Sequence, residues 1–343
     1  MSANSLFLVI LTASVIGALL LNVASIKWGL KWAGIRDISM AKAVALLLVL
    51  WLACLLAGAV LGLITLLATI EPSDRFLDLV GYLGQFVILW VVVAQVYKAR
   101  LWQAAKAVVP YAVVSVSMML MAFFVFRPFA YEAFWIPTNS MAPTLLGTHW
   151  SATCPKCGHL AYGTPVDSRS FVPLPDVMMM CSKERQPVLI SNPPKEIGDG
   201  DRILTCKFIS AERWDLVVFR YPQDPTVNYV MRLVGLPGEK LEIHDGAVWI
   251  NGEKLVPPES IAGIRYSPTI EFNGQIYSGP GSVPVVLGPD EYFVLGDFAE
   301  QSSDSRFWER GAPGYPPYAV PESHIVGVVI NIYWPVSRWT SFR

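Results

Sequence analysis

The sequence has few charged residues for its length. Aspartate, glutamate, lysine and arginine make up 15% of the 343 residues, compared with about 25% in an average soluble domain. The formal net charge is -1, so the composition offers no electrostatic attraction for nucleic acid as a partner. Internal repeats and low-complexity tracts are also absent from the sequence. At 343 residues the chain is longer than a typical single domain and is expected to form two units.

The shortage of charge is concentrated in the first part of the chain, which contains four long hydrophobic blocks. These blocks span residues 6–26, 43–70, 79–97 and 108–126. Each is close to the ~20 residues that a helix needs to cross a ~30 Å hydrocarbon layer, and such long uncharged blocks are rare in soluble cores. The sequence therefore predicts a multi-pass membrane protein with a four-helix transmembrane anchor at 1–126.

The loops between these blocks differ in charge. The loops after the first and third blocks are basic, and the loop after the second is acidic. Their charged residues are Lys27, Lys31, Arg36, Asp37 and Lys42, then Glu71, Asp74, Arg75 and Asp78, then Lys98, Arg100 and Lys106. Because basic loops stay in the cytoplasm, both ends of the chain are expected on the exterior face, together with everything after about residue 127.

Residues 127–343 show short apolar or alternating runs separated by glycine, proline, asparagine and aspartate. Such runs are typical of strands, and one of them covers 241–250. The pair Asn251-Gly252 that follows is a strong hairpin signal, since both central positions of a type I′ turn favour positive φ. A mostly β domain is predicted, interrupted by long insertions at about 147–198 and 255–287.

A segment just beyond the last hydrophobic block contains a candidate nucleophile, Ser140. Residues 131–145 read Tyr-Glu-Ala-Phe-Trp-Ile-Pro-Thr-Asn-Ser-Met-Ala-Pro-Thr-Leu and resemble the nucleophile segment of type I signal peptidases, also called leader peptidases. Three further segments resemble that family in the same order: 214–222, 229–239 and 295–308. Four ordered motifs make the resemblance specific, and it implies a peptidase domain of the signal peptidase type.

The resemblance implies a set of catalytic roles. Ser140 would be the nucleophile that attacks the scissile carbonyl. Thr138 occupies the position of a hydroxyl that stabilises the oxyanion together with the Ser140 N–H. Ser302 matches a serine that orients the general base. Asp304 and Arg306 match a supporting ion pair near the site.

The resemblance also implies a substrate and a location. Phe134, Ile136 and Pro137 match positions that line the small pockets for the Ala-x-Ala-like end of a signal peptide. The implied function is a membrane-bound serine endopeptidase that cleaves signal peptides from exported preproteins and requires no cofactor. Its partners would be those preproteins, the lipid bilayer and the secretion machinery. Its catalytic domain would lie on the exterior (periplasmic) face of the plasma (inner) membrane.

The chain departs from the family pattern at Met231, where the general-base lysine is expected. Methionine fills a similar buried volume but accepts no proton, and loss of a general base typically costs about 10²–10⁴ in rate. Three explanations are open: an inactive homologue that binds signal peptides, a different base, or an engineered replacement. The candidate bases are Lys207, Lys240 and His244. The alternative for each is a solvated surface residue without a catalytic role. Phe-Ala at 298–299, where the family has Asn-Arg, also favours altered activity.

Cysteines in the first insertion suggest a metal site. Cys154 and Cys157 form a Cys-Pro-Lys-Cys turn like half of a zinc ribbon, and Cys181 is a third candidate ligand. The fourth ligand would be His159 or Cys206, although neither is well positioned in the sequence. A disulfide is the alternative on an oxidising exterior face. A third interpretation of the chain is therefore a zinc-ribbon interaction module on a peptidase-like scaffold.

Overall fold

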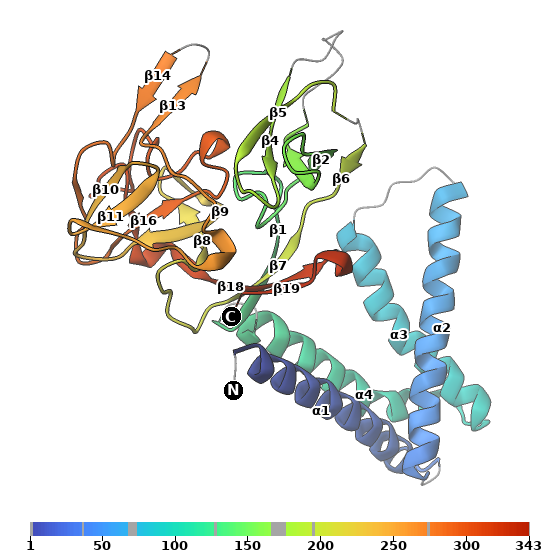
Figure 1. The fold of residues 1–343 in the computed structure, drawn as a ribbon. Helices are drawn as coiled ribbons and strands as arrows, with labels where there is room; N and C mark the ends of the chain where they lie inside the picture. Colours follow the sequence, from blue (N-terminus) through green and yellow to red (C-terminus); the bar gives the residue numbers. More distant parts are fainter. Residues whose placement is uncertain are drawn as a thin grey trace. The chain divides into compact units, whose positions relative to one another are not determined.

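The computed structural model describes residues 3–35, 38–67, 74–126, 129–165, 176–193, 196–272 and 275–342. The chain divides into two compact units, Met1–Arg127 and Pro128–Arg343 (Figure 1). Several charged residues of the predicted loops lie outside the described residues, namely Arg36, Asp37 and Glu71. The same holds for part of the first predicted insertion, at 166–175 and 194–195.

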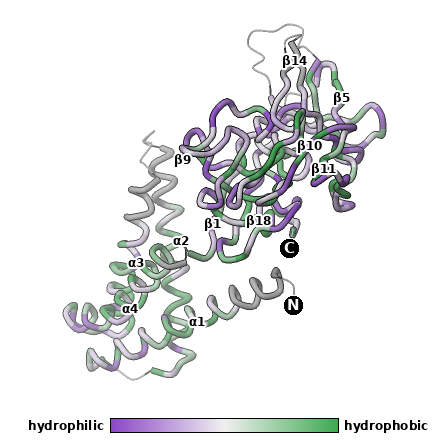
Figure 2. The backbone as a smooth tube through the Cα atoms, turned by 90° about the vertical axis from the view of Figure 1, so that its left-hand side faces the viewer, coloured by the Kyte–Doolittle hydropathy of each residue, from purple (hydrophilic) through white to green (hydrophobic). Residues whose placement is uncertain are grey.

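The first unit consists of helices over the four hydrophobic blocks. They are α1 (Ala3–Trp32), α2 (Met40–Leu67), α3 (Asp74–Val96) and α4 (Leu101–Met121), which continues into a π-helical turn, η1 (Ala122–Phe126). The residues of these helices are largely hydrophobic (Figure 2). Their sequences explain the choice of structure, since long runs of leucine, alanine and valine without internal charge satisfy their backbone groups within a helix.

The helices differ in how well they suit a membrane. Within the described residues, three stretches are long and apolar enough to cross one: Thr12–Trp32, Met40–Ala59 and Leu101–Phe124. α3 contributes a shorter apolar stretch, Gly81–Val96. The predicted apolar helices are therefore confirmed, whereas the count of four membrane spans remains a prediction.

The helical unit has polar contacts between its helices and exposes large apolar side chains. Ser115 on α4 donates a hydrogen bond to the Asn22 side chain on α1 at 3.3 Å, which links the two helices. Leu50 on α2 is fully buried, whereas Leu52 and Leu55 on the same helix are 59% and 72% exposed. Exposed apolar side chains of this kind are expected where lipid replaces water as the solvent.

The second unit is built on an eight-stranded antiparallel sheet (Figure 1). Its strands run in the order β1 (Tyr131–Trp135), β7 (Arg202–Cys206), β18 (Ile325–Trp334), β8 (Leu216–Tyr221), β9 (Asp224–Gly235), β16 (Glu291–Leu295) and β17 (Val320–Pro321), with β19 (Thr340–Ser341) paired to β18. Phe219 on β8 packs in one buried cluster with Val294 on β16 and Val328 on β18. The mostly β domain is as predicted.

The described part of the first insertion forms a separate antiparallel sheet. Its strands are β5 (Pro187–Ile190), β4 (Val177–Cys181), β3 (Leu160–Gly163), β2 (His149–Thr153) and β6 (Ile197–Gly198), in that order. Trp150, Ala161 and Met179 are buried in its small core. The region predicted only as a long insertion therefore has its own hydrophobic centre.

A third sheet begins after β9, and its strands differ from one prediction made for residues 241–250. Its strands are β12 (Glu253–Lys254), β11 (Ala247–Ile250), β10 (Lys240–His244) and β15 (Val285–Val286). The turn between β11 and β12 has φ of 52° at Asn251 and 84° at Gly252, which confirms the predicted hairpin. The prediction of one strand over 241–250 is wrong, because Asp245 and Gly246 also have positive φ and reverse the chain between β10 and β11.

The second insertion contains short elements. It includes a 3-10 turn, η3 (Glu259–Ile261), and a two-stranded sheet of β13 (Thr269–Phe272) and β14 (Gln275–Ser278), before β15 joins the third sheet. The other helical elements that the described residues of this unit form are 3-10 turns: η4 (Ala299–Gln301), η5 (Glu322–His324) and η6 (Val336–Arg338). Of these, η4 matters most for the site, since it lies within the last family-like segment, 295–308.

Candidate active site

Ser140 lies in a loop after β1 that hydrogen bonds hold on both sides. The N–H of Phe298 donates to the Ser140 carbonyl at 2.9 Å. The adjacent Asn139 side chain is buried; its Nδ2 donates to the Thr148 carbonyl at 2.8 Å and its Oδ1 accepts from the Gly147 N–H at 3.0 Å. These contacts fix the backbone of the loop and leave the Ser140 side chain half-buried.

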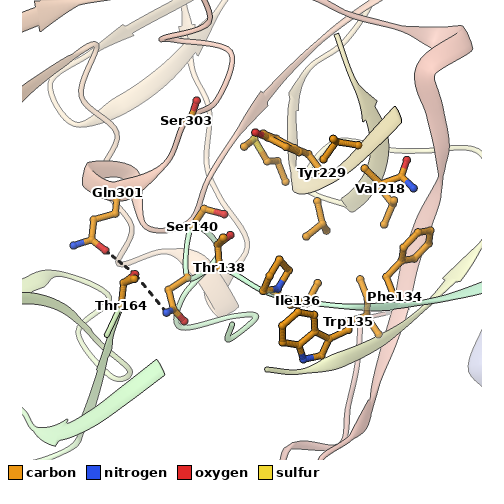
Figure 3. Close-up of a pocket in the computed structure, with 17 residues that line it drawn as sticks. Phe134, Trp135, Ile136, Thr138, Ser140, Thr164, Val218, Tyr229, Gln301 and Ser303 are labelled. Atoms are coloured by element: carbon orange, nitrogen blue, oxygen red, sulfur yellow. Dashed lines mark hydrogen bonds between the residues drawn. The ribbon is translucent and has the colours of Figure 1, made fainter. Parts of the chain in front are cut away.

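A pocket of about 540 Å³ lies beside Ser140 (Figure 3). Phe134 and Ile136 line it from β1 and the segment that follows, Val218 from β8 and Tyr229 from β9. Among the 17 described residues that line the pocket, none carries a carboxylate, an amine, a guanidinium or an imidazole. The pocket is therefore neutral and largely apolar.

Several predicted site residues meet at this pocket. Phe134, Ile136 and Pro137, predicted to contact substrate, all line it, as do Thr138 and Ser140. Thr138 is exposed, so its hydroxyl is accessible to a bound molecule. The structure thus brings the predicted nucleophile, the predicted oxyanion donor and the predicted substrate contacts to one cavity, while their roles remain predictions.

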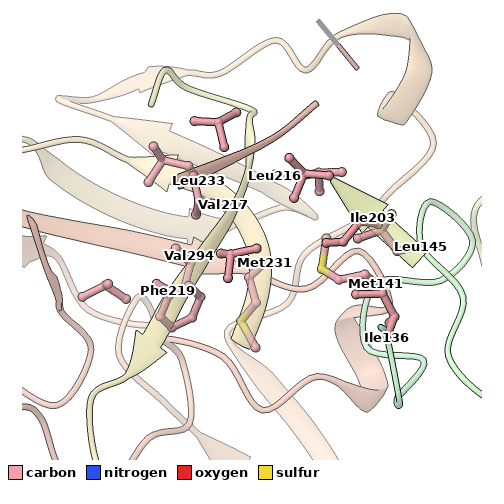
Figure 4. Packing of buried hydrophobic residues seen from close by; sticks show 14 of the residues in the cluster. Ile136, Met141, Leu145, Ile203, Leu216, Val217, Phe219, Met231, Leu233 and Val294 are labelled. Atoms are coloured by element: carbon pink, nitrogen blue, oxygen red, sulfur yellow. The ribbon is translucent and has the colours of Figure 1, made fainter. Parts of the chain in front are cut away.

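Met231 also lines the pocket, and it is part of the apolar core. It lies on β9 opposite Val217 of β8, and only 2% of its surface is exposed. Its neighbours in the buried cluster include Ile136 and Met141 (Figure 4). The position at which the family pattern expects a base is therefore beside the nucleophile loop, and it holds a side chain that accepts no proton.

Ser302 lies next to the nucleophile loop, and Gly296 lies between the two. A Cβ at Gly296 would be 2.1 Å from Ser302 Oγ and 2.7 Å from the Ser140 carbonyl oxygen, so no larger residue fits there. The Ser302 hydroxyl is buried and has no hydrogen-bond partner among the described residues. Leaving such a group unpaired costs about 1–3 kcal/mol, so its retention needs an explanation.

The predicted ion pair of Asp304 and Arg306 is present and fully buried. Arg306 Nε and Nη2 lie 2.8 and 2.7 Å from the two carboxylate oxygens of Asp304. Asp304 also accepts the Gly296 N–H at 3.0 Å, and Arg306 Nη2 donates to the Ala299 carbonyl at 2.8 Å. The pair therefore holds the loop that carries Ser302 and does not itself line the pocket.

A second buried ion pair joins Arg232 to Asp297. Arg232 Nε and Nη2 lie 2.7 and 2.5 Å from the two carboxylate oxygens, and Nη1 donates to the Trp214 carbonyl at 2.7 Å. Burial by itself lowers the pKa of a guanidinium, but the Asp297 carboxylate reverses this and raises the pKa of Arg232. Since Arg232 follows Met231 in β9, the pair fixes that strand to the last motif.

The three alternative bases considered from the sequence do not reach the pocket. Lys207 pairs with Glu132 at 2.7 Å, and Lys240 pairs with Glu242 at 3.1 Å on β10. The His244 ring stacks on a tryptophan of the neighbouring strand, with 4.5 Å between ring centroids. None of the three is among the described residues that line the pocket. The geometry gives none of them access to Ser140.

The first insertion contributes to the rim of the pocket, which sequence reasoning missed. Thr164 follows β3 and lines the pocket together with Gln301 of η4. The Thr164 hydroxyl donates to Gln301 Oε1 at 3.4 Å and lies 3.5 Å from Asn139 Nδ2. Gln301 Nε2 in turn donates to the Met178 carbonyl on β4 at 3.3 Å. No sequence motif marked Thr164, and for Asn139 the only signal was its place directly before Ser140.

Comparison with known proteins shows which proteins this chain is similar to. The family model described as signal peptidase, peptidase S26, matches residues 167–334. A signal peptidase I of Pseudomonas fluorescens is 29% identical over 233 residues, which cover 62% of this chain and 68% of that protein. The chain is similar to type I signal peptidases over these lengths. The family-model match begins beyond Ser140, so it assigns no role to that residue of this signal peptidase homologue.

Other signal peptidases match over shorter lengths. The signal peptidase I of Rickettsia akari is 38% identical over 117 residues, 28% of this chain and 44% of that protein. That of Leptolyngbya laminosa is 34% identical over 149 residues, 40% of this chain and 62% of that protein. Both matches span less than two thirds of those relatives. A crystal structure of a signal peptidase I from Enterococcus faecalis matches with 25% identity and a TM-score of 0.26. The match covers 35% of this chain and 97% of the crystallised chain.

Proposed function

We propose that this signal peptidase homologue binds the end of a signal peptide in the pocket beside Ser140 without cleaving it efficiently. The observation that carries the proposal is the pocket lining, which retains Ser140 and Thr138 and holds Met231 in place of a base. Small apolar residues, such as an Ala-x-Ala end of a signal peptide, suit a neutral pocket walled by Phe134 and Ile136.

Cleavage needs a group that takes the Ser140 proton while its Oγ attacks the carbonyl carbon. The Thr138 hydroxyl and the Ser140 N–H would stabilise the oxyanion, an effect of roughly 3–4 kcal/mol per donor. Met231 accepts no proton, and no other base lines the described pocket. Loss of a general base lowers the rate by roughly 10²–10⁴, so a bound peptide would leave the pocket far more often than it is cut.

The unpaired Ser302 hydroxyl supports the same conclusion. In the family pattern this serine orients the base, and an amine at position 231 is the group it would contact. With methionine at 231 that partner is lost. If a lysine at 231 has been lost, the Ser302 hydroxyl is expected to remain without a hydrogen-bond partner. The hydroxyl is buried, so water cannot replace the hydrogen bond to the lost amine.

An active serine endopeptidase is the second candidate function. It is favoured by the retention of Ser140, Thr138 and Ser302 close to one pocket. Such an enzyme would have to obtain its base from outside the described pocket lining, for example from the bound substrate or a partner protein. It predicts cleavage of an Ala-x-Ala preprotein that disappears when Ser140 is replaced by alanine.

We further propose where the protein acts. The apolar helices of the first unit would anchor it in the plasma (inner) membrane, and the second unit would lie on the exterior (periplasmic) face. This proposal is supported by the basic residues of the first and third loops, which favour the cytoplasm. The partners would be the lipid bilayer, the signal peptides of exported preproteins and the secretion machinery from which they emerge.

Photocrosslinking tests the binding proposal. A signal peptide with a photoreactive residue near its Ala-x-Ala end would be added to the full-length protein in liposomes. Val227 lines the pocket and is exposed, so Val227→Arg should reduce crosslinking at least tenfold by placing a charge in an apolar site. Val256 is exposed and does not line the pocket, so Val256→Arg is the matched control and should leave crosslinking unchanged. Equal crosslinking in both variants would contradict the proposal.

A further inference from the structure

Three cysteine sulfurs converge in the first insertion, and none of these cysteines is among the described residues that line the pocket. The Sγ atoms of Cys154, Cys157 and Cys181 all lie within 4.8 Å of one another, and those of Cys157 and Cys181 are 3.4 Å apart. A tetrahedral zinc ion with Zn–S bonds of about 2.3 Å requires sulfur separations of about 3.8 Å. The three thiols therefore fit around one ion with movements well below the length of a bond.

The cysteines lie in two turns of the same conformation. The Gly158 N–H donates to the Cys154 carbonyl at 2.9 Å, and the Arg185 N–H donates to the Cys181 carbonyl at 3.0 Å. Each of these two cysteines also donates its N–H to the carbonyl five residues on, at 2.7 and 3.1 Å. Gly158 and Arg185 both have positive φ, 75° and 50°. Positive φ is unfavourable for arginine, so contacts with the surrounding structure must stabilise the turn at Arg185.

Backbone N–H groups point at the sulfurs in both turns. The N–H groups of Lys156 and Cys157 donate to the Cys154 sulfur. The Glu184 N–H lies 3.5 Å from the Cys181 sulfur in the second turn. Bonds of this kind stabilise the thiolate form, which is the form that binds a metal. Both turns thus direct at least one backbone N–H at a cysteine sulfur.

The match between the turns also indicates the fourth ligand. Cys157 is the third residue after Cys154, and Glu184 is the third residue after Cys181, so Glu184 occupies the position of a second cysteine. Its side chain is exposed and a carboxylate oxygen is an accepted zinc ligand. Cys206, considered earlier, lies on β7 and pairs with strands of the main sheet, so it is not available to this cluster.

We propose that Cys154, Cys157 and Cys181 bind a zinc ion, with the carboxylate of Glu184 as the fourth ligand after a change of its side-chain rotamer. The ion would join the β2–β3 turn to the β4–β5 turn. The sheet it joins has a small core, and small cores often depend on a metal for stability. This inference does not rest on the proposed function, because it concerns a different site and different residues.

The zinc site would stabilise the side of the pocket formed by the insertion. Arg185, next to Glu184, donates from Nη1 to the Thr144 hydroxyl at 3.2 Å, and Thr144 bonds to Asp297. Thr164, at the end of β3, lines the pocket. The ion would thus hold in place a segment that supports both the nucleophile loop and the last motif, without taking part in the chemistry.

Metal analysis of the full-length protein tests the proposal. Purified in detergent under reducing conditions without chelator, it should contain zinc in a one-to-one ratio to the chain. After removal of zinc, added Co²⁺ should give thiolate-to-cobalt charge-transfer absorption and tetrahedral d–d bands. Cys181→Ser should lose this spectrum, and Glu184→Ala should weaken Co²⁺ binding at least tenfold. Cys54→Ser, which changes a cysteine in α2, is the matched control and should bind normally.

Two results would overturn the proposal. One is a chain free of zinc whose Cys157 and Cys181 form a disulfide by mass spectrometry of the unreduced protein. The other is a cobalt spectrum that persists in Cys181→Ser. If Cys181→Ser fails to fold, Glu184→Ala decides, because an exposed glutamate is not needed for folding except as a ligand. Equal Co²⁺ affinity in Glu184→Ala and the parent chain would show that Glu184 is not a ligand and would contradict the proposed four-ligand site.

Discussion

Arg232 and Asp297 form a buried ion pair in which Nε–Oδ1 and Nη2–Oδ2 distances are 2.7 and 2.5 Å. The pair lies between the strand that carries Met231 and the motif that contains Gly296. Because the contact is bidentate and both side chains are buried, it fixes the position of residue 231 relative to the Ser140 loop. The ion pair therefore supports the backbone of the site, although the residue at the base position, Met231, is apolar.

Removal of one partner of this pair should strongly destabilise the second unit. Asp297→Asn leaves the Arg232 guanidinium buried without a charge partner, which typically costs about 3–5 kcal/mol. The double variant Arg232→Met with Asp297→Leu should be less destabilised than Asp297→Asn, because it leaves no buried charge. Denaturant unfolding followed by tryptophan fluorescence measures both. Equal loss in the single and double variants would contradict this view of the pair.

Replacement of Ser302 by alanine should have opposite effects in two backgrounds. In the parent chain its hydroxyl has no partner among the described residues, so Ser302→Ala should be neutral or stabilise the fold by up to about 1 kcal/mol. In a Met231→Lys background the same change should lower cleavage roughly tenfold or more, because the hydroxyl then orients an amine. Thermal unfolding and a cleavage assay supply the two readouts. A clear destabilisation of the parent chain would indicate that the hydroxyl has a partner.

Gly296 should not tolerate a side chain. A Cβ there would meet Ser302 and the Ser140 carbonyl at less than 3 Å, so Gly296→Ala should destabilise the second unit by roughly 1–3 kcal/mol. Gly58 has no atom within 4 Å of an added Cβ, and Gly58→Ala is the matched control. Thermal unfolding of both variants checks the expectation, and a stable Gly296→Ala would show that the loop can move away.

Membrane topology distinguishes four spans from three. If α3 crosses the membrane, cysteines introduced at Asp74 and Thr340 lie on the same exterior face, and one at Lys31 lies in the cytoplasm. If α3 does not cross, Asp74 and Thr340 lie on opposite faces. A membrane-impermeant thiol reagent applied to intact spheroplasts, read on the peptide that carries each introduced cysteine, decides between them. We expect labelling at Asp74→Cys and Thr340→Cys and protection at Lys31→Cys.

Much of the fold was predictable because its signals are local. Long apolar blocks specify helices, and Asn251-Gly252 specifies a hairpin turn by its backbone preference alone. Asp245-Gly246 is an equivalent turn signal, and by the same backbone preference it divides 241–250 into two strands. The apolar residues on both sides of the turn make the run resemble one strand. The sheet of the first insertion was not predicted, because its strands are short and its cysteine turns separate them.

The candidate site was predictable only where motifs name residues. Ser140, Thr138 and Met231 were found by their motifs, and the structure brings them to one pocket. Thr164 was not found, because its contact with Gln301 joins segments that are far apart in sequence. The unpaired state of Ser302 was also unpredictable, since a missing hydrogen bond depends on every neighbour at once.

Cleavage by the Met231→Lys variant is the most direct measurement of the central claim. The full-length protein in liposomes would be assayed with a preprotein that ends its signal peptide in Ala-x-Ala, with Met231→Leu as the control for volume. We expect the parent chain and Met231→Leu to be nearly inactive, and Met231→Lys to cleave at least 10²-fold faster, in line with what a general base contributes. That gain should vanish when Ser140→Ala is added. Rapid cleavage by the parent chain, or no gain from the lysine in a folded variant, would contradict the account.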